Sequence, residues 1–368
     1  MNLADSERLA GVLETAGYTE AKDHWDVDIL VVNTCVVRQS AEDRAAWFVT
    51  SAKGQKEDNP NMKIVVCGCF VSEPGRDVRK QFPHVDLFLG PNEPEKLEAF
   101  LVEEDRTPSS HRSLRYGLSA YSETDGVSRR PLAASRQSKR TAWVTIMQGC
   151  DNFCSYCVVP YVRGREKSRT IDDIMAEIKA IDLSQFEEIY LLGQNVNSYA
   201  YGLANLLREI NKIVQQQLVI SHSSLDIKFM TNHPKDMSDE IIDTVAELPH
   251  VAKSFHLPIQ HGDDEILKSM NRGYTVEQYK KIVAKIRAKV PDAKISCDVI
   301  VGYPGETEEQ FENTLKIIRE VKYSEVRMAA YSPRPNTAAA ALPNQLSDEV
   351  KKARLQRLIE LVREVVKS

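Results

Sequence analysis

The sequence predicts an α/β protein with an N-terminal doubly wound parallel sheet, followed by a partial (β/α)6 barrel of the TIM type. Short apolar runs alternate with helical patterns along most of the chain, as they do in parallel sheets covered by helices. The 368 residues exceed what a single hydrophobic core usually serves, so two domains are expected. We place these domains at residues 1–104 and 141–368, joined by a basic linker at 105–140.

The first domain is expected to alternate strands with helices. Apolar runs predict strands at Asp28–Asn33, Lys63–Gly68 and Asp86–Gly90, and helical patterns predict helices at Ser6–Ala16, Ala41–Lys53 and Glu93–Glu104. Cys35 and Cys69 follow the first two strands. Because the carboxyl ends of parallel strands meet in one crevice, both thiols lie where a ligand would bind. The residues alone leave open that they are ordinary buried thiols. Cys67 shares a strand face with Cys69, and core packing is its default role.

The linker is rich in Ser, Arg, Thr and Gly and shows no apolar periodicity. From Arg106 to Arg140, eight basic residues against Glu123 and Asp125 give a local charge of +6, although the whole chain carries −5. The basic residues are Arg106, Arg112, Arg115, Arg129, Arg130, Arg136, Lys139 and Arg140. Tyr116 and Tyr121 interleave with them, a mixture that suits phosphate contact and base stacking in RNA. A solvated charge run is the alternative.

The second domain repeats the strand and helix pattern, and we count six βα units. Strands are predicted at Thr141–Met147, Glu188–Leu192, Ser224–Met230, Ser254–Ile259, Lys294–Val301 and Glu325–Tyr331. Helices are predicted at Ile171–Ile181, Asp239–Glu247, Val276–Ala288 and Glu308–Val321. Cys297 has no partner at metal-ligand spacing and is assigned to the core.

Three cysteines, Cys150, Cys154 and Cys157, follow the apolar run Ala142–Met147 in one loop. Three closely spaced thiolates can hold three irons of a cubane cluster and leave the fourth iron open. Structural zinc usually needs a second Cys or His pair, and none completes the set here. The loop therefore predicts a reactive iron–sulfur cluster at the carboxyl end of a strand.

Polar segments follow four of the later strands of this domain, where barrel enzymes bind ligands. They are Leu191–Tyr199, Thr231–Pro234, His256–Gly262 and Gly302–Thr307. Each segment alone reads as a turn with capping residues. Four basic side chains, Arg163, Arg165, Lys167 and Arg169, lie just after the cysteine loop, and a buried substrate anion or an RNA backbone would explain them.

The cysteine loop resembles that of the radical SAM superfamily. There, S-adenosylmethionine chelates the open iron, and one-electron reduction cleaves it to a 5′-deoxyadenosyl radical. The same resemblance places segments after the second and fifth strands around S-adenosylmethionine. In this chain those segments supply Gln194, Asn195, Gly302, Pro304 and Gly305.

The segments Asn33–Arg38 and Gly68–Cys69 resemble the N-terminal domain of methylthiotransferases, which binds an auxiliary 4Fe-4S cluster through three cysteines. The resemblance assigns Cys35 and Cys69 to that cluster. The family's remaining ligand precedes Met1, so it and the first strand of the sheet are expected to be missing from this chain, and Cys67 is the substitute to consider. The C-terminal RNA-binding TRAM domain of the family is expected to be missing too.

Further motifs are similar to those of MiaB-type tRNA methylthiotransferases. They are Met147–Cys150, Arg163–Glu166, Leu191–Tyr199, Met270–Thr275 and Tyr331–Pro335. Gln194–Asn197 favours this branch over the one that modifies a ribosomal protein. The resemblance implies an enzyme that adds a methylthio group to carbon 2 of N(6)-isopentenyl-adenosine, next to the anticodon of tRNA. It implies the tRNA anticodon stem-loop as substrate and an electron donor such as flavodoxin or ferredoxin, while the sulfur donor stays unidentified.

Two alternatives remain at this point. One is a methylthiotransferase acting on threonylcarbamoyl-adenosine in tRNA or on a ribosomal protein, and the other is a non-catalytic iron–sulfur or RNA-binding module. The longest apolar runs, such as Ile29–Val32, are too short to cross a bilayer. Seven cysteines, three of them in one loop, suit metal binding in a reducing compartment. A cytoplasmic protein without membrane contact is therefore expected.

Overall fold

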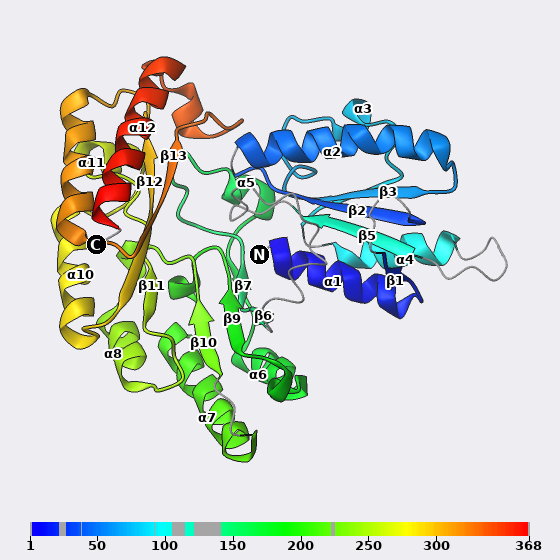
Figure 1. The fold of residues 1–368 in the computed structure, drawn as a ribbon, viewed down its shortest axis with the longest axis horizontal. Coiled ribbons are helices and arrows are strands. Elements are labelled where there is room, and N and C mark those ends of the chain that lie inside the picture. Colours follow the sequence, from blue (N-terminus) through cyan, green and yellow to red (C-terminus); the bar gives the residue numbers. More distant parts are fainter. Residues whose placement is uncertain are drawn as a thin grey trace. The chain divides into compact units, whose positions relative to one another are not determined.

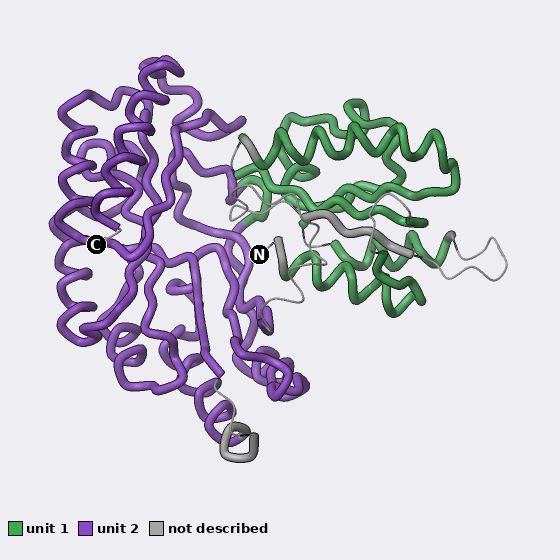
Figure 2. The backbone as a smooth tube through the Cα atoms, viewed as in Figure 1, with its two compact units in different colours: residues 1–140, 161–164 green, residues 141–160, 165–368 purple. Residues whose placement is uncertain are grey.

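The computed structural model of the chain describes residues 2–21, 27–37, 39–91, 93–104, 115–120, 141–221 and 225–366. The chain forms two compact units (Figure 2). Unit 1 comprises residues 1–140 and 161–164, and unit 2 comprises residues 141–160 and 165–368. No helix in the described part of the chain is both long and apolar enough to span a bilayer.

Unit 1 is built on a parallel sheet that, among the described residues, has five strands in the order β1-β5-β2-β3-β4. The strands are β1 (Thr19–Glu20), β2 (Ile29–Thr34), β3 (Lys63–Gly68), β4 (Leu87–Leu89) and β5 (Arg115–Ala120). The helices are α1 (Asn2–Thr15), α2 (Gln39–Asp58), α3 (Val78–Gln81) and α4 (Pro94–Glu104). Helices α2 and α3 cover one face of the sheet and α1 and α4 the other (Figure 1), which confirms the doubly wound arrangement.

The face under α1 and α4 shows why the sequence folds in this way. Leu13 of α1 and Leu97 of α4 are fully buried against Val31 and Val65, which alternate with residues of the opposite face along their strands. Cys67 belongs to the same apolar cluster and is 3% exposed. Its thiol contacts only the backbone oxygen of Val32 among the hydrogen bonds described for it, at 3.5 Å. This placement supports the core-packing role of Cys67.

Strand β5 lies within the segment that we expected to be a linker without regular structure, and that expectation is wrong for residues 115–120. It pairs with both β1 and β2, so it occupies an inner position of the sheet. The run Arg-Tyr-Gly-Leu-Ser-Ala has too little apolar content to predict a strand, and its pairing depends on backbone partners distant in sequence. Arg129, Arg130 and the other basic residues of 121–140 lie outside the described residues, as do Arg106 and Arg112.

Unit 2 has six parallel strands among its described residues, in the sheet orders β10-β9-β6 and β11-β12-β13, with a separate β7/β8 ribbon. The strands are β6 (Thr141–Thr145), β7 (Met147–Gln148), β8 (Lys167–Ser168), β9 (Glu188–Leu192), β10 (Asp226–Phe229), β11 (Ser254–His256), β12 (Lys294–Val301) and β13 (Glu325–Ala330). The consecutive strands, each followed by a helix or a turn, confirm the predicted partial barrel (Figure 1).

Amphipathic helices cover the outside of this barrel. They are α6 (Ile171–Ala180), α7 (Leu203–Ser221), α8 (Asp239–Glu247), α9 (Asp264–Ser269), α10 (Val276–Lys289), α11 (Glu308–Val321) and α12 (Asp348–Val365), while the short α5 (Val159–Arg163) follows the cysteine loop. Thr275 and Thr307 begin α10 and α11 with capping boxes, which satisfy backbone N–H groups that would otherwise lack partners. Along β12, buried residues alternate with half-buried ones, and Cys297 is fully buried in the core as expected.

Candidate active site

The loop with Cys150, Cys154 and Cys157 begins directly after β7, at the carboxyl end of the first barrel strand. The backbone N–H of Cys157 donates to the Cys154 oxygen at 2.9 Å, which closes a tight turn. Cys154 is buried, and the other two thiols are half-buried. Burial raises the pKa of Cys150 and of Cys157, and repulsion from the neighbouring cysteines raises both further. The three sulfurs therefore lie close enough together to feel one another's charge.

The segment Met270–Arg272, after α9, holds this loop in shape. The Met270 oxygen accepts from the Ser155 N–H at 3.0 Å. The Asn271 side chain donates to the Asn152 and Phe153 oxygens, both at 3.1 Å. Asn271 itself has a φ of 57°, a left-handed conformation that Asn tolerates better than most residues. The motif Met270–Thr275 thus supports the cysteine loop across the barrel.

Arg272 brings a guanidinium group to the loop. Its Nη1 donates to the Cys154 sulfur at 3.3 Å, and the residue is 4% exposed. Tyr156 and Tyr274 contribute hydroxyl groups at 3.4 and 3.0 Å from guanidinium nitrogens, and the Pro258 oxygen lies 3.1 Å from Nη2. A cation is therefore fixed against the most buried of the three thiols.

Tyr303 joins the cysteine loop to the segment after β12. Its fully buried ring carries a hydroxyl group that donates to the Ser269 oxygen at 3.0 Å and lies 2.8 Å from the Ser155 Oγ. Ser155 stands between two of the three cysteines. The position of the Gly302–Glu306 segment is therefore coupled to that of the cysteine loop.

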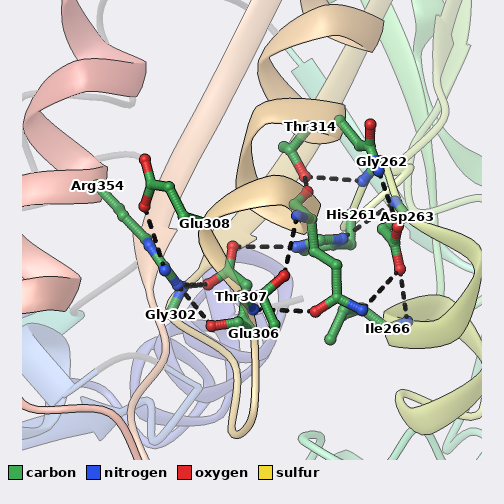
Figure 3. A network of polar contacts seen from close by, with 12 residues as sticks. His261, Gly262, Asp263, Ile266, Gly302, Glu306, Thr307, Glu308, Thr314 and Arg354 are labelled. Atoms are coloured by element: carbon green, nitrogen blue, oxygen red, sulfur yellow. Dashed lines mark hydrogen bonds and ion pairs between the residues drawn. The ribbon is translucent and has the colours of Figure 1, made fainter.

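The Gly302–Glu306 segment is organised around a buried carboxylate (Figure 3). The Gly302 N–H donates to Glu306, whose carboxylate also lies 3.1 Å from His261 Nε2 and 3.1 Å from Arg354 Nη1. Arg354 comes from α12 and also donates to the Glu306 backbone oxygen at 2.9 Å. Gly302 has a φ of 73°, and a Cβ there would meet the Lys351 side chain. In the same segment, Pro304 is buried and Gly305 is exposed.

The segments after β9 and β10 are hydrogen-bonded to each other. Asn197 Nδ2 donates to the His233 oxygen at 2.8 Å, and its Oδ1 accepts from the His233 N–H at 2.9 Å. Asn195 Nδ2 donates to Asp236 at 2.8 Å. The side-chain oxygens of Gln194 and Asn195 are buried and have no hydrogen-bond partner among the described residues. Both oxygens are thus available to a bound ligand.

His233, whose backbone is hydrogen-bonded to the Asn197 side chain, is 4% exposed. Burial lowers the pKa of His233 to about 2, and the positive charges of Arg272 and Lys235 add to the effect. Its Nδ1 accepts from the Lys235 N–H at 3.3 Å. The proton of the neutral ring is therefore on Nε2.

In unit 1, Cys35 and Cys69 are both buried at the ends of the neighbouring strands β2 and β3. The Cys69 N–H donates to the Thr34 oxygen at 3.2 Å. Gly68 has a φ of 95°, and a Cβ on it would come within 2.4 Å of that oxygen. Only glycine therefore lets the two cysteine-bearing segments approach so closely. The backbones of the two segments that carry these cysteines are therefore in direct contact at the ends of β2 and β3.

Arg163 belongs to unit 1, where it hydrogen-bonds the Cys69 thiol and forms an ion pair with Asp5 at 2.8 Å. It is 8% exposed and paired with Asp5, so the expectation that it contacts an RNA backbone is wrong. Arg169 of unit 2 is paired with Glu177 and donates to the Thr145 oxygen. Of the four basic residues after the cysteine loop, Arg165 and Lys167 are the exposed ones.

Two curated relatives match almost the whole chain. The tRNA-2-methylthio-N(6)-dimethylallyladenosine synthase of Clostridium beijerinckii is 41% identical over 370 residues, which cover 98% of this chain and 78% of the relative. The enzyme of the same name from Clostridium botulinum (strain Eklund 17B / Type B) is 41% identical over 376 residues, with 99% and 78% covered. The chain belongs to the tRNA-2-methylthio-N(6)-dimethylallyladenosine synthase family.

Its regions match two further family descriptions. Residues 144–318 match the radical SAM superfamily, and residues 1–90 match an uncharacterized family, UPF0004. The radical SAM methyltransferase TsrM from Kitasatospora setae, solved with cobalamin and a 4Fe-4S cluster, has the same fold at a TM-score of 0.61 and 16% identity, covering 90% of this chain and 68% of TsrM. The radical SAM enzyme OxsB has a TM-score of 0.52 at 12% identity, with 92% and 48% covered.

The cysteine loop of this synthase-family chain fits a 4Fe-4S cluster better than a single metal ion. Among the described residues, no three Cys, His, Asp or Glu side chains converge on one point. A cubane places its cysteine ligands on different irons, so it needs three thiols that are near one another but not convergent. The buried Arg272 guanidinium beside Cys154 also suits a group with net negative charge.

Sequence reasoning missed the residues that support this site. Arg272, Tyr303 and Arg354 were not singled out, because their contacts join segments far apart in the sequence. Arg272 does lie in the motif Met270–Thr275, and that motif was the one available signal.

Proposed function

We propose that this protein transfers a methylthio group to carbon 2 of N(6)-isopentenyl-adenosine, next to the anticodon of tRNA. The observation that carries the proposal is 41% identity to a synthase of this name over 98% of the chain. The described site agrees with it, since the matched region contains the supported cysteine loop and the polar strand ends.

In this proposal Cys150, Cys154 and Cys157 hold the 4Fe-4S cluster that reacts with S-adenosylmethionine. When bound, these two groups supply the 5′-deoxyadenosyl radical that activates an otherwise unreactive C–H bond. The buried side-chain oxygens of Gln194 and Asn195 accept hydrogen bonds from S-adenosylmethionine. Gly302, Pro304 and Gly305 bring backbone close to it. Tyr303 keeps this segment aligned with the cysteine loop.

We assign Cys35 and Cys69 to an auxiliary 4Fe-4S cluster. Their burial and the close approach of their two segments support this assignment, as does the Arg163 contact with Cys69. Buried guanidinium groups stabilise thiolates and anionic clusters. The position of Cys67 in the apolar cluster of unit 1 argues against its serving as a ligand.

The proposal further includes the tRNA anticodon stem-loop as partner, a flavodoxin or ferredoxin as electron donor, and the cytoplasm as the location of this tRNA modification. Basic residues of 105–140 are the proposed RNA contacts. Local positive charge is needed because the chain carries a net charge of −5.

The test is expression in a bacterial strain that lacks its own tRNA methylthiotransferase of this type but makes isopentenyl-adenosine. Mass spectrometry of digested tRNA should show the methylthio derivative of isopentenyl-adenosine. A strain carrying Cys154→Ala should not show it. Methylthiolated threonylcarbamoyl-adenosine instead would support the alternative tRNA substrate. If the protein cleaves S-adenosylmethionine but the tRNA contains neither methylthio nucleoside, a tRNA substrate is refuted.

A further inference from the structure

We propose that Arg272 is a positioning residue that sets the reduction potential of the cluster held by Cys150, Cys154 and Cys157. It does so by presenting a buried positive charge to the Cys154 sulfur. The inference rests on the proposed function only in that these cysteines bind a 4Fe-4S cluster.

The surroundings of Arg272 fix the guanidinium group in one orientation. Nε donates to the Tyr274 hydroxyl at 3.0 Å, Nη2 to the Pro258 oxygen at 3.1 Å, and Nη1 to the Cys154 sulfur at 3.3 Å. Tyr274 is itself held, because its hydroxyl donates to the Ile259 oxygen at 2.7 Å. The planar fork of Arg matches these three directions, and the single ammonium group of Lys does not.

The charge of Arg272 has no carboxylate partner within the described part of the chain. Its hydrogen-bond acceptors are two phenol groups, one backbone oxygen and the Cys154 sulfur. Phenols and backbone oxygens are neutral near pH 7, so Cys154 is the one acceptor that becomes an anion when it binds iron. A cation that is 4% exposed is costly unless an opposite charge compensates it.

This pairing has a direct consequence for the cluster. One-electron reduction adds a negative charge next to Arg272, which stabilises the reduced form more than the oxidised form. Hydrogen bonds to the sulfur ligands and nearby charge are among the means by which proteins set cluster potentials. Arg272 therefore raises the potential and makes the electron easier to accept from a low-potential donor.

The experiment compares the potentials of wild type, Arg272→Met, Arg272→Lys and Tyr274→Phe in the full chain. Each protein is reconstituted anaerobically with iron and sulfide, matched for iron content, and titrated with dithionite while the reduced cluster is followed by electron paramagnetic resonance. Arg208→Gln is the matched control, because Arg208 forms an exposed ion pair with Glu240 on α7 and α8.

Arg272→Met should make reduction less favourable by about tenfold or more, which is a shift of about 59 mV to lower potential for one electron. Arg272→Lys should give a smaller shift in the same direction, since it keeps the charge but loses the fork. Tyr274→Phe should shift the potential less still, and Arg208→Gln should not shift it. Thermal melting of each variant shows whether a changed reduction potential is accompanied by loss of the folded structure.

Equal potentials in wild type and Arg272→Met would overturn the proposal. If Arg272→Met does not assemble a cluster, Arg272→Lys and Tyr274→Phe test the proposal instead. Wild-type reduction potentials in both of these variants would overturn the proposal. The proposed function fails separately. A chain with an arginine-dependent potential that makes no methylthio nucleoside would refute the substrate but not the role of Arg272.

Discussion

The two groups of cysteines in this protein are built in different ways. Cys150, Cys154 and Cys157 lie in one loop of unit 2, whereas Cys35 and Cys69 come from the ends of two neighbouring strands of unit 1. In each group, one thiol is hydrogen-bonded to a buried arginine side chain. Arg163 beside Cys69 also forms an ion pair with Asp5, while Arg272 beside Cys154 has no carboxylate partner among the described residues.

This difference shows how similar parts can serve different chemistry. In unit 1 the positive charge of Arg163 is shared between the Asp5 carboxylate and the Cys69 thiol. In unit 2 no carboxylate of the described residues pairs with Arg272, so its positive charge acts on the bound cluster. That charge stabilises the reduced cluster more than the oxidised one. The comparison predicts that the two groups respond differently to the same kind of substitution.

Removing a ligand from unit 2 is expected to have the largest effect. Cys154→Ala should lower the iron content by about four atoms per chain, because one cubane carries four irons. It should also abolish formation of 5′-deoxyadenosine, as measured by chromatography after anaerobic reduction. Cys297→Ala is the matched control, since Cys297 is fully buried in the core and should affect melting temperature but not iron. Full iron retention in Cys154→Ala would show that the loop is not the cluster site.

Removing the cysteines of unit 1 should affect a different step. The double variant Cys35→Ala and Cys69→Ala should keep 5′-deoxyadenosine formation, because the cysteines of unit 2 are untouched. It should lose the methylthio nucleoside, because the proposed auxiliary cluster has lost its ligands. Cys67→Ala should leave iron content unchanged, since its thiol packs in the apolar cluster. If the double variant also lost cofactor cleavage, the two groups would not be independent.

Glu306→Gln tests the buried network behind the glycine segment of unit 2. It replaces the buried carboxylate that pairs with Arg354 by a neutral amide and leaves Arg354 only the exposed Glu308, at a cost of about 3–5 kcal/mol in unfolding free energy. Binding of S-adenosylmethionine should weaken because a neutral amide accepts from the Gly302 N–H less strongly than the carboxylate does. Denaturant unfolding and calorimetric titration measure the two effects.

Glu308→Gln is the control for that substitution. Glu308 also pairs with Arg354, but its side chain is 60% exposed, so its loss should cost only about 0–1 kcal/mol. Equal destabilisation by the two substitutions would mean that burial of the Glu306 carboxylate is not what matters.

The smallest expected effect concerns pH and reports on the charge of Arg272. Burial first, then Arg272 and Lys235, lower the folded-state pKa of His233 to about 2 from the ordinary value of 6.5. The unfolded chain therefore binds a proton below pH 6.5 that the folded chain does not. This contribution to stability is complete above that pH and is lost as the pH falls, by about 1.4 kcal/mol per pH unit.

His233→Asn should flatten the decline in unfolding free energy between pH 6 and pH 4, with His250→Asn as the matched control. Denaturant titrations at each pH measure the free energy of unfolding. Identical slopes for wild type and His233→Asn would contradict a neutral, buried His233.

Much of the fold could be predicted because the signals are local. An apolar run predicts β3, and helical patterns predict α8 and α11, all with the bounds that the structure gives. The spacing of three thiols within one loop points to a cluster. Strand β5 could not be predicted in this way, since its partners in β1 and β2 determine it. Arg163 was misjudged for the same reason, because its partner Asp5 is 158 residues away in the chain.

The support of the cysteine loop by Met270–Arg272 also sets an order in time. Cys154 and Arg272 are 118 residues apart. At a synthesis rate of about 5–20 residues per second, the loop waits roughly 6–24 s for the segment that shapes it. Until then its thiols stand on a flexible nascent chain with no fixed geometry. Insertion of the cluster therefore belongs after the barrel has closed, and a delivery factor would have to recognise the folded protein rather than the emerging loop.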